Sequence, residues 1–110
     1  MNWLHDVSYL FGGMVFTNAI PHFVRGVTGQ PFQSPFAKPP GQGLSSSAVN
    51  VLWGFVNFVI AYVLIVCVGS FDLRAIDNAI AAGAGALLMG VASARMFGRF
   101  HGGNNAPAGS

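Results

Sequence analysis

The sequence contains few charged residues. Asp, Glu, Lys and Arg together make up 7% of its 110 residues, whereas about a quarter of residues are charged in an average soluble domain. None of the four types occurs between Lys38 and Asp72. This composition argues against a soluble globular domain. The five Lys and Arg residues are scattered beside apolar segments, which argues against nucleic acid as a partner.

Cysteine pairs and clustered catalytic residues are also missing. Cys67 is the single cysteine and lies inside an apolar segment, so we expect it to pack in the core, without a disulfide or a thiolate metal site. His5, His22 and His101 lie in three separate regions. Asp6 would be about 24 Å from His22 along a continuous helix, too far to orient its imidazole. We therefore expect no catalytic activity, no metal site and no cofactor.

In place of charge, the chain has apolar segments long enough to cross a membrane. A hydrocarbon core of about 30 Å requires about 20 residues of helix. Three segments fit this length or approach it, the last with only 17 uncharged residues: 7–24, 48–71 and 78–94. We predict an all-α polytopic membrane protein in which residues 1–101 form one domain of three transmembrane helices. Residues 102–110 lack apolar periodicity and are predicted to be a disordered tail.

The charges that flank these segments predict their orientation. An acidic residue precedes the first segment and Arg25 follows it, so we interpret the segment as a retained span, because a secretory signal has its basic residues first. With three spans, one side of the membrane carries Arg25, Lys38, Arg95 and Arg99. The excess of positive charge places that side, with the C-terminus, in the cytoplasm and the N-terminus outside a bacterial-type inner membrane.

Small side chains line one side of the third segment. They are Ala79, Ala82, Gly83, Ala86, Gly90 and Ala94. In lipid, helices associate by close packing of such small-xxx-small surfaces, because lipid tails supply no hydrophobic drive between them. We expect this face to pack either against another span of the same chain or against a second copy, and both alternatives stay open.

Polar side chains recur at helical spacing on the first two segments. Asn18 and His22 share one side of the first segment, and Asn50 and Asn57 share one side of the second. In an antiparallel hairpin these groups lie at similar depths. We favour a hydrogen-bonded seam between the two helices. The alternative is that the same side chains line a path for a small solute, because polar residues inside membranes often mark such routes.

The connection between the first two segments, residues 26–47, is long and rich in Pro. Four prolines, at positions 31, 35, 39 and 40, prevent a regular helix through most of it. We predict that Phe32, Phe36 and Lys38 lie at the lipid headgroups, where aromatic and basic side chains are favoured. The alternatives are a docking site for a partner protein, or a segment that folds back over the polar side chains as a gate.

These features predict a small non-catalytic integral membrane protein. Its expected role is that of an accessory or assembly subunit that acts through helix–helix contacts, with the lipid bilayer and either itself or a larger membrane protein as partners. The alternative is a homo-oligomeric channel or carrier for a neutral or anionic small solute, lined by Asn18, Asn50 and Asn57.

Overall fold

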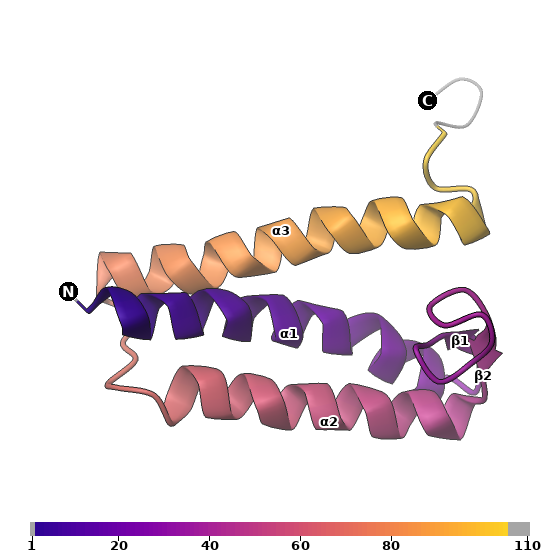
Figure 1. Ribbon diagram of the computed structural model, residues 1–110, viewed down its shortest axis with the longest axis horizontal. Coiled ribbons are helices and arrows are strands. Elements are labelled where there is room, and N and C mark those ends of the chain that lie inside the picture. The colour runs from indigo at the N-terminus through magenta and orange to yellow at the C-terminus, as the bar shows by residue number, and fades with distance from the viewer. Residues whose placement is uncertain (1, 106–110) are drawn as a thin grey trace.

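The computed structural model describes residues 2–105, which form three helices in a row and a small two-stranded loop. The helices are α1 (Trp3–Val27), α2 (Ser47–Val66) and α3 (Ile76–His101). Figure 1 shows α1 between the other two. Both α2 and α3 make extensive contacts with α1, and they make none of comparable extent with each other. The three helices therefore form one open layer with α1 in the middle.

Local sequence explains where the helices begin and end. The side chain of Asn2 accepts hydrogen bonds from the backbone N–H groups of Leu4 and His5, and so caps α1. The Ser46 hydroxyl accepts from Val49 N–H in the same way at the start of α2. At the end of α3, Gly102 takes the left-handed conformation, with φ of 79°, that favours glycine.

α2 and α3 differ in length from the predicted spans. α2 ends at Val66 rather than near residue 71, because the chain turns there and Gly69 takes a φ of 59°. Cys67 therefore lies at the end of α2 and is exposed, not packed in a core. α3, which corresponds to the shortest predicted span, has 26 residues and continues past Arg95 as far as His101.

α2 and α3 are each long and apolar enough to cross a membrane. α1 has the length, with 25 residues, but it is less apolar. Residues 102–105 of the predicted tail form a turn in which Asn104 Nδ2 donates to the Arg95 carbonyl at 2.9 Å. The rest of that tail, residues 106–110, lies outside the described residues.

Glycine allows α3 to approach α1 closely. A Cβ atom added to Gly85 would collide with the backbone carbonyl of Leu10, and one added to Gly13 would collide with the carbonyl of Ala82. Ala82 and Ala86, which belong to the predicted small-residue face, lie at this contact. The two backbones therefore meet without intervening side chains, as close helix packing in lipid requires.

The predicted small-residue face is rotated relative to the contact with α1. Gly83 and Ala94 are exposed, and Gly83 has no atom within 4 Å of an added Cβ. Ala79 and Gly90 are half-buried beside the contact. Residues four apart in an α-helix are offset by about 40° around its axis. A row of small residues at this spacing on α3 therefore turns gradually away from α1. Gly85, which the prediction omitted, is buried at the centre.

A matched pair of substitutions tests this contact. Gly85→Ala is expected to lower the free energy of unfolding by about 1–3 kcal/mol, because the new methyl group meets backbone that cannot move aside. Gly83→Ala is expected to leave stability unchanged or raise it by up to about 1 kcal/mol, because Ala favours the helix and meets open space. Equilibrium unfolding in detergent, followed by circular dichroism, measures both. Equal effects of the two substitutions would contradict the packing described here.

Candidate functional site

The loop between α1 and α2 folds back onto one end of the helix layer. β1 (Phe32–Gln33) pairs antiparallel with β2 (Leu44–Ser45), with Phe32 opposite Ser45. Within this loop, the Ser34 carbonyl accepts from Gly41 N–H at 2.8 Å, and the hydroxyls of Ser34 and Ser45 are hydrogen-bonded to each other. The loop is therefore an ordered cap over the helices (Figure 1).

Phe32 lies inside this cap and not at a lipid surface, which corrects the sequence prediction. Its side chain is 4% exposed. The ring lies 4.6 Å from that of Phe97, is stacked on His101 at 5.8 Å and meets the His22 ring edge-on at 5.4 Å. The Arg25 guanidinium lies 5.6 Å from its centre. An aromatic cluster thus joins the loop to α1 and α3.

The other two loop residues of the prediction remain on the surface. Phe36 is 62% exposed, and its ring meets that of Trp53 edge-on at 5.0 Å. Lys38 is exposed. These two positions stay compatible with contact to lipid headgroups or to a partner.

The side chain of Asn50 connects the loop to α1 and α2. Its Nδ2 donates to the carbonyls of Phe32, Ser45 and Ser46, at 3.2, 3.2 and 3.1 Å. Its Oδ1 lies 2.8 Å from His22 Nδ1. Because the amide nitrogen faces three carbonyls, the oxygen must accept and His22 Nδ1 must donate. Asn50 is fully buried, and both of its polar atoms are paired.

Asn18 and Asn57 form a second pair between α1 and α2. Asn18 Nδ2 donates to Asn57 Oδ1 at 3.3 Å, and Asn57 Nδ2 donates to the Trp53 carbonyl at 2.8 Å. The four polar residues singled out from the sequence therefore lie together, in two pairs. The loop carbonyls that bind Asn50 were not anticipated.

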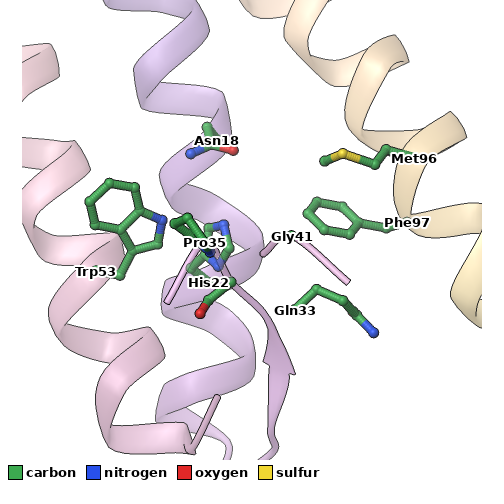
Figure 2. Close-up of a pocket in the computed structure, with 9 residues that line it drawn as sticks. Asn18, His22, Gln33, Pro35, Gly41, Trp53, Met96 and Phe97 are labelled. Atoms are coloured by element: carbon green, nitrogen blue, oxygen red, sulfur yellow. The ribbon is translucent and has the colours of Figure 1, made fainter. Parts of the chain in front are cut away.

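Next to these pairs lies a cavity of about 230 Å³. It is lined by Asn18 and His22 from α1, Trp53 from α2, Met96 and Phe97 from α3, and Gln33, Ser34, Pro35 and Gly41 from the loop. In Figure 2, Trp53 lies on one side of the cavity and Met96 and Phe97 lie on the other. The sequence prediction does not include α3 in this site, because the predicted span ends before Arg95. The only signal in the sequence was the apolar pair that follows Arg95.

A second polar cluster lies at the opposite end of the layer and fixes the connection between α2 and α3. Asn78 Nδ2 donates to Asp6 at 3.1 Å and to Asp77 at 3.3 Å, while its Oδ1 accepts from Asp72 N–H at 3.0 Å. Partial burial raises the pKa of the Asp6 carboxyl, the nearby Asp77 carboxyl raises it further, and the Asn78 amide opposes this. The Tyr9 hydroxyl donates to the Val68 carbonyl at 2.6 Å. This cluster is structural in character.

No family model, curated protein or solved structure matches the chain. Among residues 2–105, no three His, Cys, Asp or Glu side chains come together as a metal site would require. The function must therefore be argued from the geometry of the helices, the loop and the cavity.

Asn50→Leu tests whether this amide holds the loop in place. The substitution leaves the carbonyls of Phe32, Ser45 and Ser46 without their shared donor, so it is expected to lower the free energy of unfolding by about 3 kcal/mol or more. Amide hydrogen exchange in residues 32–45 is expected to accelerate. Asn57→Leu is the control and is expected to cost about 1 kcal/mol or less, without faster exchange in the loop. A loop that stays protected in Asn50→Leu would refute this role.

Proposed function

We propose that this protein is a small non-catalytic membrane subunit that crosses the inner membrane three times and assists the assembly or stability of a larger membrane protein. The observation that supports this role is the open layer of helices. α1 is covered on two sides only, because α2 and α3 pack against it and not against each other. Its two remaining faces are left for lipid or for another protein.

The uncovered faces of α1 carry large apolar side chains. Phe11, Phe16 and Val24 are 50%, 48% and 51% exposed. A helix at the centre of a water-soluble layer would bury such side chains, since each contributes about 1.5–3 kcal/mol when fully removed from water. Their exposure supports an apolar environment around α1 and hence a third membrane crossing.

The exposed part of the small-residue surface of α3 supports contact with a partner. Gly83 and Ala94 are exposed, and Gly83 meets open space. Small residues allow the backbone of a second helix to come close. Within the described residues, Ala82 and Ala86 of this surface contact α1, whereas its exposed part is available to a partner helix.

The arrangement of the Asn residues favours this role over a channel. Asn50 is fully buried and Asn57 is 5% exposed, and their amides bind other groups of the chain. A solute path requires polar groups that face an open route. These amides instead hold α1, α2 and the loop together.

We further propose that the loop and the C-terminal end of α3 face the cytoplasm. Both lie at the same end of the layer in Figure 1, so Arg25, Lys38, Arg95 and Arg99 are on one side. An excess of Lys and Arg marks the cytoplasmic side of membrane proteins. The connection between α2 and α3, with Cys67, then faces outward.

The single cysteine allows this orientation to be tested without altering the chain. A membrane-impermeant maleimide is expected to modify Cys67 in intact cells, because the thiol is exposed at the outer end of α2. The control is Thr28→Cys in a Cys67→Ser background, at an exposed position on the opposite side. It is expected to react only after the membrane is permeabilised. The reverse pattern would overturn the orientation.

Purification in mild detergent tests the accessory role. The chain is expected to elute with one larger membrane complex at a fixed ratio. Gly83→Leu is expected to reduce that association at least about tenfold, because a large side chain blocks close approach of a helix, while leaving the contact with α1 intact. Val59→Leu, at a site 47% exposed on α2, is the control and should change nothing. A purified homo-oligomer that passes solutes in liposomes would refute the accessory role and support the channel.

A further inference from the structure

We propose that the cavity beside His22 binds a hydroxylated aromatic ring, the head group of a lipid-soluble phenol or hydroquinone. This inference goes beyond the accessory role. The cavity is formed within one chain, whereas the membrane source of the ligand rests on the proposed membrane embedding. It rests on the size of the cavity, on its aromatic walls, and on three polar atoms that have no hydrogen-bond partner among residues 2–105.

The cavity has the size and walls of a site for one substituted ring. An apolar cavity of about 150 Å³ suffices to bind benzene, and this one has about 230 Å³. Figure 2 shows Trp53 on one side and Phe97 on the other. A flat ring between these side chains can make favourable edge or offset contacts with both.

His22 supplies a hydrogen-bond acceptor. The ring is 3% exposed, and its Nδ1 donates to Asn50. In the neutral imidazole the other nitrogen, Nε2, therefore carries the lone pair. His22 lines the cavity whereas Asn50 does not, and in this proposal the Nε2 edge of the imidazole faces the cavity. An acceptor at the wall of a largely apolar cavity favours a ligand with an O–H group, because that group can donate to its lone pair.

Two further polar atoms suit the same hydroxyl chemistry. Asn18 donates to Asn57 through Nδ2, which leaves Oδ1 on the side of the amide that faces Met96 in Figure 2. The indole nitrogen of Trp53 lies on the side of its ring that faces His22. The cavity thus offers two acceptors and one N–H donor. A phenolic hydroxyl matches this set, because it can donate and accept at once.

The position of the cavity points to a ligand that arrives from the membrane. Four loop residues form its cap: Gln33, Ser34, Pro35 and Gly41. His22 lies five residues, or about 7.5 Å, before the end of α1. The cavity lies above α1, between walls from α2 and α3, and these two helices do not pack closely against each other. Entry between α2 and α3 would bring a ligand in from the hydrocarbon, and this is the route that we propose.

Tryptophan fluorescence can test this proposal in the full-length protein. Trp3 is 69% exposed at the far end of α1, so a Trp3→Phe variant in phosphatidylcholine vesicles reports on Trp53 alone. A hydroquinone with a ten-carbon alkyl chain is expected to quench this signal saturably. The dimethyl ether of the same molecule is expected to bind about tenfold more weakly or worse, because it cannot donate to His22. Asn18→Leu is expected to weaken binding of the hydroquinone at least about fivefold.

Two controls are needed. The first distinguishes binding at the site from partition of the ligand into lipid, and the second tests whether the ligand enters from the membrane or from water. In Trp53→Phe, the remaining Trp3 should show only non-saturable quenching. Hydroquinone without an alkyl chain, added from water, should bind at least about tenfold more weakly. Absence of saturable quenching, equal affinity of the dimethyl ether, or saturable quenching of Trp3 would overturn the site. Equal affinity of the chainless hydroquinone would overturn the membrane source. None of these outcomes bears on co-purification with a larger complex.

Discussion

The Asn50 amide is the interaction on which this structure most depends. It joins three parts of the chain: the start of α2, the ring of His22 on α1, and the first strand of the loop. Because Nδ2 faces three carbonyls, the loop is held against the helix ends and Phe32 is placed among His22, Phe97 and His101. The same amide fixes which nitrogen of His22 carries the proton. The cavity, its aromatic walls and its free acceptor all follow from this arrangement.

The layered architecture has an equally simple origin in glycine. α1 meets α3 through Gly13 and Gly85, and it meets α2 through Gly12 and Gly26, whose added Cβ atoms would collide with Ile65 and Val51. Small residues on two sides of one helix allow two neighbours to approach closely, and α2 and α3 make no contact of comparable extent with each other. The result is a helix with two covered sides and two apolar open faces. This shape supports the proposed role as a subunit that lies against other membrane proteins.

Much of the helical framework and the seam between α1 and α2 could be predicted from the sequence. The spacing of Asn18, His22, Asn50 and Asn57 placed these residues on facing sides, because helical periodicity and an antiparallel hairpin together determine their depth. The end of α3 could not be predicted from the position of Arg95, since a helix can continue past a charged residue once it leaves the hydrocarbon. The packing face predicted for α3 is rotated relative to the observed one, because residues at intervals of four drift around a helix. Gly85, and not Gly83, lies at the contact with α1.

The loop and the cavity were beyond prediction for a different reason. The Pro residues exclude a regular helix in the loop. Its folded conformation, however, depends on the carbonyls of Phe32, Ser45 and Ser46, which all accept from the Asn50 side chain. No local pattern specifies such a convergence. The cavity likewise requires residues from all three helices and the loop to meet.

The central place of α1 has a consequence for biogenesis. The hydrogen-bond partners of Asn18 and His22 are Asn57 and Asn50, which lie on the helix that follows in the chain. α1 therefore cannot pair these polar side chains until α2 has been made. If α1 crosses the membrane, as we propose, the two helices are expected to enter the bilayer together rather than one after the other.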